Sequence, residues 1–204
     1  MPPASQHDAS CVSTVPHKII GIDPGSVVTG WGIVEIVGSS LFHVAHGTIA
    51  TAGADGQGER LSRIYRGLQA VIAAYRPDGV SLERIFFARN PQSALKLGQA
   101  RGVALLAAAH NQLMVHEYAA AEIKVAVVGY GQATKEQVQC MVAALLKVAE
   151  RIAPDASDAL AAAICHLHRQ CLQSGIPGAV TECSTTMRRR RSSLASLKKF
   201  VGRV

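Results

Sequence analysis

The sequence predicts an α/β protein in which helices cover both faces of a mixed five-stranded sheet. Three observations predict this fold class: strand-like segments come first, later strands alternate with helical patterns, and two helices close the chain. The length of 204 residues suits one compact domain, and 49% apolar residues provide a sizeable core. We expect that domain to span residues 17–174.

The first three strands lie between Lys18 and Thr51. KIIGID has the pattern of a short buried strand, and PGS forms the turn after it. TGWGIVEIV and LFHVAHGTIAT are the next two strands, joined by a turn at residues 38–40. These segments predict an antiparallel meander.

The remainder of the body alternates helices with strands. Apolar residues recur at helical spacing from Leu61 to Tyr75, and Arg76-Pro77 ends that helix. DGVSLERI is the fourth strand, and LMVHEY is the fifth. Because helices connect these strands, they should run parallel to the first strand by the right-handed crossover rule.

Three further helices complete the predicted element order. A long helix runs from Pro91 to Asn111 between the fourth and fifth strands. The last two helices span Lys135–Arg151 and Asp158 to about Gln173, with a break at residues 152–155.

The positive charge of the chain is confined to its end. The formal charge is +7 and the pI is near 9.4. Residues 184–204 carry seven basic and no acidic side chains, so the body is formally neutral. We expect residues 1–16 to be a disordered extension and residues 175–204 a disordered basic tail.

Composition excludes several classes of protein. Uncharged stretches such as Gly102–Asn111 are shorter than the roughly 18 residues that a bilayer span needs, which excludes a membrane protein. The five cysteines are odd in number, form no C-x-x-C pair and follow no apolar signal segment. A disulfide scaffold is therefore disfavoured, and a cytoplasmic location is predicted.

Two acidic residues stand at the ends of neighbouring predicted strands. Asp23 follows the first strand, at the edge where open α/β sheets bind ligands, and Glu83 follows the fourth. Each also has a structural interpretation, because Asp-Pro-Gly makes a turn and a charge at a strand end is often solvated. Their possible adjacency suggests a metal-binding pair.

Two further acidic residues begin the last helix. Asp155 and Asp158 are three residues apart, so their side chains share one face of its first turn. Asp155 as N-cap with Asp158 at the third position is equally a capping arrangement. Four carboxylates on three elements are what a two-metal phosphodiesterase needs, since Mg²⁺ prefers oxygen ligands.

Other motifs carry weaker signals. Cys165, His166, His168 and Cys171 lie on one helix, which cannot wrap a tetrahedral zinc ion, so packing is the better interpretation. Gly129-Tyr130-Gly131 lacks the third glycine of a dinucleotide loop, and the chain has no P-loop motif.

Basic and aromatic residues near these acids are candidates for contacts with nucleic acid. Cations here would neutralise phosphates, although solvated surface charge is the default interpretation for each one. Of the adjacent Phe86 and Phe87, one should enter the core while the other stacks on an unpaired base. The candidate phosphate contacts are Arg84, Arg89, Lys96, Arg101, Lys124 and Lys135. The residues predicted to contact DNA at the site are Phe86, Arg89, Gln99, Arg101, Lys124 and Lys135.

Taken together, the motifs resemble one known family. The GIDPGS segment at residues 21–26, Leu82-Glu83, the run SALKLGQARG at residues 93–102, and Asp155-x-x-Asp158 are similar, in the same order, to the RuvC family of bacterial Holliday-junction resolvases. The resemblance covers about residues 18–172. It implies a ribonuclease H-like three-layer fold and metal-dependent, paired, symmetric nicking of four-way DNA junctions in recombination and repair.

The resemblance also implies residue roles and partners. Asp23, Glu83, Asp155 and Asp158 match the family's catalytic metal ligands, which bind two Mg²⁺ ions per site, with Mn²⁺ as a possible substitute. A branch-migration helicase is the implied partner complex. A homodimer would match the approximate two-fold symmetry of the junction, with the helix Pro91–Asn111 as its candidate interface or else as an ordinary core helix.

Two other functions fit parts of the sequence. A catalytically silent junction-binding scaffold would use the same four acids only for capping and turns. A sugar-kinase or actin-like ATPase shares the Asp-Pro-Gly-Ser turn after a strand, but such enzymes need two comparable lobes and this chain has the length of one.

Overall fold

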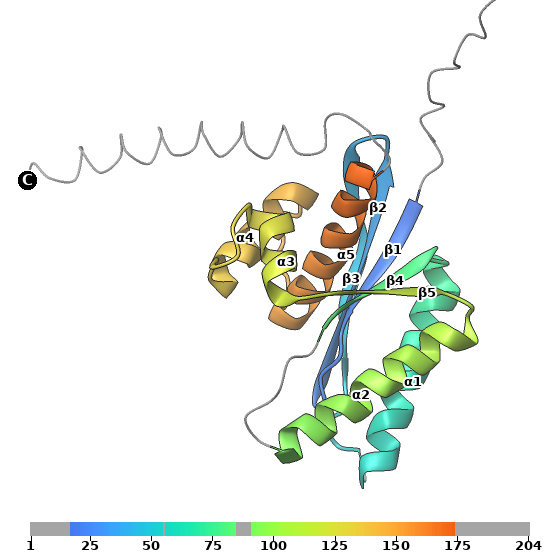
Figure 1. The fold of residues 1–204 in the computed structure, drawn as a ribbon. Helices are drawn as coiled ribbons and strands as arrows, with labels where there is room; N and C mark the ends of the chain where they lie inside the picture. The colour runs from blue at the N-terminus through green and yellow to red at the C-terminus, as the bar shows by residue number, and fades with distance from the viewer. Residues whose placement is uncertain (1–16, 55, 85–90, 174–204) are drawn as a thin grey trace, which may run out of the picture.

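The computed structural model describes residues 17–54, 56–84 and 91–173, which form three layers (Figure 1). The central sheet has the strand order β3-β2-β1-β4-β5. Its strands are β1 (His17–Asp23), β2 (Val28–Val37), β3 (Ser40–Ala50), β4 (Gly79–Glu83) and β5 (Met114–Tyr118). The helices are α1 (Gly56–Tyr75), α2 (Pro91–His110), α3 (Ala120–Val128), α4 (Lys135–Leu146) and α5 (Pro154–Gln173).

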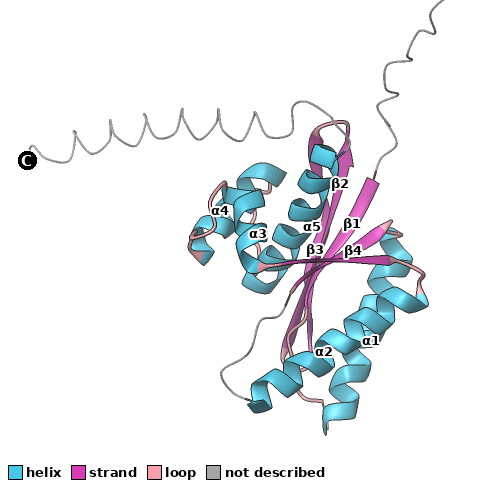
Figure 2. Ribbon diagram, viewed as in Figure 1, coloured by secondary structure: helices cyan, strands magenta, loops and turns pink. Residues whose placement is uncertain are grey.

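The predicted fold class is confirmed. Strands β1, β2 and β3 pair antiparallel as a meander, whereas β4 runs parallel to β1 and β5 runs parallel to β4. Helices α3, α4 and α5 cover one face of the sheet, and α1 and α2 cover the other (Figure 2). None of the helices within the described residues is long and apolar enough to cross a membrane.

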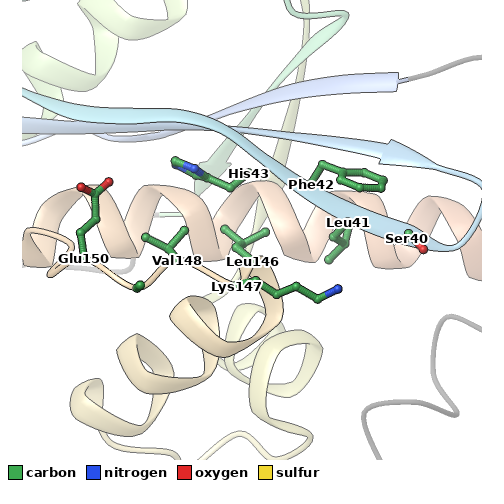
Figure 3. Close-up of a pocket in the computed structure, with 9 residues that line it drawn as sticks. Ser40, Leu41, Phe42, His43, Leu146, Lys147, Val148 and Glu150 are labelled. Carbon is green, nitrogen blue, oxygen red and sulfur yellow. The ribbon is translucent and has the colours of Figure 1, made fainter.

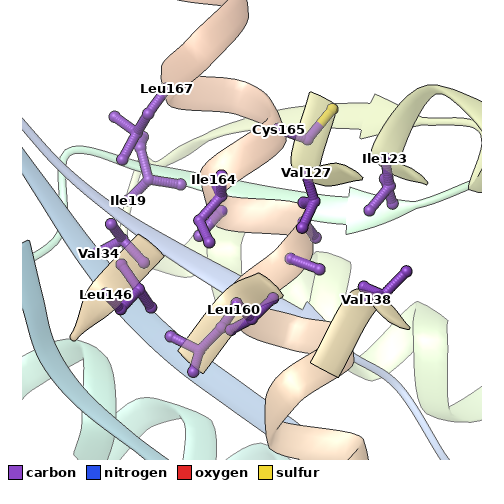
Figure 4. Packing of buried hydrophobic residues seen from close by; sticks show 14 of the residues in the cluster. Ile19, Val34, Ile123, Val127, Val138, Leu146, Leu160, Ile164, Cys165 and Leu167 are labelled. Atoms are coloured by element: carbon purple, nitrogen blue, oxygen red, sulfur yellow. The ribbon is translucent and has the colours of Figure 1, made fainter. Parts of the chain in front are cut away.

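Strand alternation divides the core into two clusters. Ile19 of β1 packs towards α5, whereas its neighbour Ile20 packs towards α1 and α2. Figure 4 shows the first cluster, where Leu160 and Ile164 of α5 meet residues from α3, α4 and the sheet. By the same alternation, Asp23 and Glu83 face the α5 side of the sheet.

Helix α5 lies unusually close to the strands because three glycines face it. A Cβ built on Gly21 would overlap the carbonyl oxygen of Ala159, and one built on Gly30 would overlap that of Asp155. The buried Ser81 hydroxyl also donates to the Ala162 carbonyl at 2.7 Å. Backbone contact and this hydrogen bond fix the helix against β1, β2 and β4.

The helices differ from the sequence predictions in three places. Helix α3 was not predicted, although Glu122 near its start and Gly129 at its end, with φ 92°, are ordinary helix signals. Helix α4 ends at Leu146 instead of Arg151, because Lys147 adopts a left-handed conformation with φ 54°. Helix α5 begins at Pro154 instead of Asp158, since proline is well suited to the first helical position.

Candidate active site

Asp23 and Glu83 lie side by side at one edge of the sheet. The parallel register pairs Ile22 with Leu82, so each acid is the next residue beyond that pair. Both side chains face the layer that contains α5, as strand alternation requires. The sequence-based expectation that these two strands are neighbours is confirmed.

Asp155 and Asp158 reach the same edge from the start of α5. The antiparallel register pairs Asp23 with Gly30, and the missing side chain of Gly30 is what admits the Asp155 backbone. Asp155 lies inside the first turn of α5, where an acidic side chain is favoured by the helix dipole. It is therefore not the N-cap, and that part of the capping interpretation was wrong.

The acids influence one another through their charges. Burial raises the pKa of Asp23 to about 6, with further upward contributions from the charges of Asp158, Glu83 and Asp155. The pKa of Glu83 is raised by burial first and then by Asp158. Such mutual repulsion shows that the structure concentrates negative charge in a partly desolvated place.

Two of the predicted DNA-contacting lysines lie beside this acidic cluster. Lys135 Nζ is 3.3 Å from Asp158 Oδ2, and this carboxylate raises the pKa of the lysine. Lys135 is the first residue of α4 and lies between Thr134 and Gln137, which form the capping box of that helix. A cation at a helix N-terminus opposes the helix dipole, so its position is explained by the acids and not by the stability of α4.

Lys124 is presented by α3, the helix that sequence reasoning missed. Its charge lowers the pKa of Glu83, after the larger effects of burial, Asp158 and Lys135. An ion pair at 2.6 Å between Arg169 Nη1 and Glu122 Oε1 holds α3 against α5. The structure thus gathers Lys124, Lys135 and the acids on one side of the sheet.

The remaining predicted DNA-contacting residues are placed differently. Gln99 accepts a hydrogen bond from Gln57 at 2.9 Å, so its side chain faces α1. Arg101 is engaged by Glu117 and by the carbonyl oxygen of Glu83. Phe86 and Arg89 lie outside the described residues. DNA contact by all six residues stays a prediction.

The acidic cluster fits a hard divalent cation in its chemistry. Carboxylate oxygens are the ligands that Mg²⁺ prefers, and a cation would offset the mutual repulsion that raises the pKa of Asp23. Within the described part of the chain, no three His, Cys, Asp or Glu side chains converge closely enough to hold a metal ion in this conformation. Lys135 contacts Oδ2 of Asp158 at 3.3 Å, and a carboxylate has a second oxygen with which to ligate a cation.

A hollow of about 630 Å³ lies elsewhere, between β3 and the segment after α4. Figure 3 shows Phe42 and His43 from β3 above Leu146, Lys147, Val148 and Glu150. None of the candidate site residues lines it. The acidic site is therefore separate from this hollow.

Comparisons with known proteins agree with the geometry. The family model described as crossover junction endodeoxyribonuclease RuvC matches residues 19–166. The chain is 53% identical over 171 residues to the crossover junction endodeoxyribonuclease RuvC of Pelobacter propionicus, covering 84% of this chain and 97% of that relative. Identity to the corresponding protein of Syntrophotalea carbinolica is 56% over 151 residues, with coverage of 74% and 94%.

Solved structures show the same relationship. Thermus thermophilus RuvC in complex with a Holliday junction substrate superposes with a TM-score of 0.73 and 31% identity, covering 78% of this chain and 97% of that one. The yeast mitochondrial Holliday junction resolvase Ydc2 superposes with a TM-score of 0.54 at 12% identity, which shows a shared fold.

Proposed function

Because the chain belongs to the RuvC family of crossover junction endodeoxyribonucleases, which are hydrolytic nucleases, we propose that it resolves four-way DNA junctions by paired, symmetric nicks. The observation that carries this proposal is that β1, β4 and α5 bring four acidic residues to one edge of the sheet, near enough for the other three to raise the pKa of Asp23. Their negative charge would repel a DNA phosphate unless cations were bound between them. A metal-dependent phosphodiesterase uses such clustered carboxylates to hold those cations.

In this proposal Asp23, Glu83, Asp155 and Asp158 hold two Mg²⁺ ions, which Mn²⁺ can replace. When bound, such ions activate water and stabilise the charge that develops in an in-line displacement at phosphorus. Lys124 and Lys135 flank the acids and would attract the phosphate backbone to the edge of the sheet. Lys135 also compensates the charge of Asp158 in the absence of metal.

Dimerisation through α2 would supply the second active site for paired cuts. The inner face of α2 is buried through alanines such as Ala100 and Ala104. On its outer face Leu95 is 65% and Leu106 is 48% exposed, and a Cβ on Gly98 or Gly102 would meet nothing within 4 Å among the described residues. Small and apolar residues spaced along one side of a helix permit close approach of a second copy around a two-fold axis.

The cellular setting follows from the substrate. A junction-resolving nuclease acts on DNA, so we propose a cytoplasmic location in a bacterium. A complex with a branch-migration helicase is part of the same proposal.

The test is cleavage of a synthetic four-way junction whose arms are labelled one at a time. With Mg²⁺ we expect nicks at symmetric positions on two opposing strands and products that DNA ligase can seal. With EDTA we expect junction binding without cleavage. Equal binding in both buffers and no nicks in either would instead identify a catalytically silent scaffold, for which the Lys135–Asp158 ion pair would be a permanent contact.

A further inference from the structure

Arg101 of α2 links two neighbouring strands beside the candidate active site. Its Nη1 donates to the Glu83 carbonyl oxygen at 2.7 Å, and its Nη2 donates to Glu117 Oε1 at 2.5 Å. The Arg101 side chain is 13% exposed, whereas that of Glu117 is 38% exposed. The guanidinium is therefore directed into the protein and not towards solvent.

The contact with Glu83 lies just beyond the end of the pairing between β1 and β4. The ladder between β1 and β4 ends with the pair Ile22 and Leu82, one residue before Glu83. On the other side, the Arg84 backbone N–H still donates to the Tyr118 carbonyl at 2.7 Å. Arg101 thus supplies a donor to a carbonyl that lies beyond the last residue of the β1–β4 ladder.

Glu117 determines where the guanidinium lies. It is the β5 partner of Leu82, so alternation directs it to the α2 side of the sheet, opposite to the Glu83 carboxylate. A guanidinium donates from a rigid planar fork, so a fixed Nη2 contact also fixes Nη1. The chain of contacts runs from Glu117 through Arg101 to the backbone of Glu83.

We propose that Arg101 and Glu117 form a positioning pair that fixes the Glu83 backbone, and through it the orientation of the Glu83 carboxylate in the active site. This inference rests on the proposed function, because it takes Glu83 to be a metal ligand. It is an alternative to the expectation that Arg101 contacts a DNA phosphate, and the experiment below distinguishes the two.

The geometry of the contact supports a positioning role. Arg101 reaches Glu83 at its backbone carbonyl oxygen, at 2.7 Å. Arg101 therefore acts on the backbone of Glu83. Outer contacts of this kind typically alter metal affinity or activity by about 10- to 100-fold when they are removed.

The experiment compares Arg101→Gln, Arg101→Lys and Glu117→Gln with the unaltered protein. We expect each to lower the single-turnover nicking rate about 10- to 100-fold at saturating protein. Arg101→Lys should not rescue the rate, because an ammonium group keeps the charge but cannot bridge both acceptors. The double variant Arg101→Gln with Glu117→Gln should be no slower than Arg101→Gln, because the two residues act as one unit.

Two measurements without catalysis separate the pair from a DNA contact. Calorimetric titration of the DNA-free protein with Mn²⁺ should show that all three variants bind Mn²⁺ more weakly than the unaltered protein. Junction affinity in EDTA, and its dependence on salt, should stay within about two-fold. If Arg101→Gln instead weakens junction binding and reduces the salt slope by about one, while Glu117→Gln changes nothing, Arg101 is a phosphate contact and the proposal is overturned.

Matched controls separate the possible failures. Arg66→Gln removes an arginine that pairs with Glu59 at 3.3 Å on α1, and it should leave the nicking rate, Mn²⁺ affinity and junction binding unchanged. Asp23→Asn in the same assays tests the proposed function itself. If Asp23→Asn abolishes nicking while the Arg101 and Glu117 variants keep normal rates and metal affinity, only the positioning pair is refuted. If Asp23→Asn nicks normally, the assignment of the acids as metal ligands is refuted, and the positioning pair is refuted with it.

Discussion

The two faces of the sheet are packed in different ways. On the α5 face, Gly21 and Gly30 bring strand backbone against helix backbone, so nothing there can yield. On the opposite face, a Cβ on Gly67 would meet the flexible end of the Ile49 side chain at 2.7 Å. The rigid face carries the acids, and the opposite face includes α2, with its exposed outer surface. We infer that the backbone-to-backbone packing on the α5 face holds the acids in place for catalysis. The opposite face, which includes α2, serves dimerisation.

Gly30→Ala should break this contrast most strongly. The new methyl group would collide with the Asp155 carbonyl, so α5 must move away from β2. We expect a loss of about 1 to 3 kcal/mol in the free energy of unfolding, measured by urea denaturation, together with slower nicking. Gly58→Ala in α1, where the methyl group meets no neighbour, should be neutral or stabilising by up to about 1 kcal/mol. Equal effects of the two substitutions would contradict the account.

Asp23→Asn should reveal the cost of the acidic cluster. The pKa of Asp23 is raised from 3.8 to about 6, so the folded state binds this proton more tightly than the unfolded state. Stability should therefore fall as the pH rises from about 4 to about 6, and it should stay lower above that range. Without divalent metal, we expect the variant to be more stable than the parent by about 1 to 3 kcal/mol at pH 7.5 and indistinguishable at pH 4. Thermal unfolding at both pH values measures this.

Asp78→Asn provides the opposite case near the other end of the same sheet. Asp78 accepts a hydrogen bond from the Lys18 backbone N–H at 2.7 Å and pairs with His17 at 3.3 Å. Removing its charge should destabilise the protein slightly at pH 7.5. A stability gain like that of Asp23→Asn would show that the effect is a general one of net charge and not of the cluster.

Leu106→Asp tests the exposed outer face of α2. If α2 is the dimer interface, a charge at this exposed leucine should weaken dimerisation by about 10-fold or more without unfolding the protomer. Analytical ultracentrifugation over a range of concentrations measures the change. Leu172→Asp on α5, where the side chain is 60% exposed, should leave the oligomeric state unaltered. A monomeric parent protein would remove the basis of the prediction.

Deletion of residues 184–204 should have the smallest effect on chemistry. This segment carries the excess positive charge but lies outside the described residues and outside the family match. We expect lower junction affinity at low salt and a shallower salt dependence, with unchanged nicking at saturating protein. Loss of cleavage at saturating protein would give the tail a role that the folded body does not explain.

Much of the fold could be predicted from the sequence because its signals are local. Alternating apolar residues identified the strands, and the order of elements gave the parallel crossovers. The start of α5 was misplaced because the proline in residues 152–155 is also typical of a break between helices, whereas Pro154 is the first residue of α5. Helix α3 was missed because its weakly amphipathic run AAEIKVAVV has no strong periodic pattern.

The candidate site was predictable as a set of residues but not as an arrangement. The positions of Asp23 and Glu83 at strand ends followed from pattern alone. The approach of Asp155 depends on the missing side chain of Gly30, which is a tertiary contact across the sheet. The engagement of Arg101 by Glu117 depends on the packing of α2 against β5, which no local sequence pattern reveals.

Single-turnover nicking of a four-way junction by Asp23→Asn, beside Asp78→Asn as the matched control, tests the central claim most directly. With Mg²⁺ and saturating protein, we predict that Asp23→Asn nicks at least about 10² to 10³ times more slowly while binding the junction with nearly unchanged affinity. Asp78→Asn should nick at close to the parent rate per folded molecule. Undiminished nicking by Asp23→Asn would contradict the claim that the acids at this edge of the sheet perform the reaction.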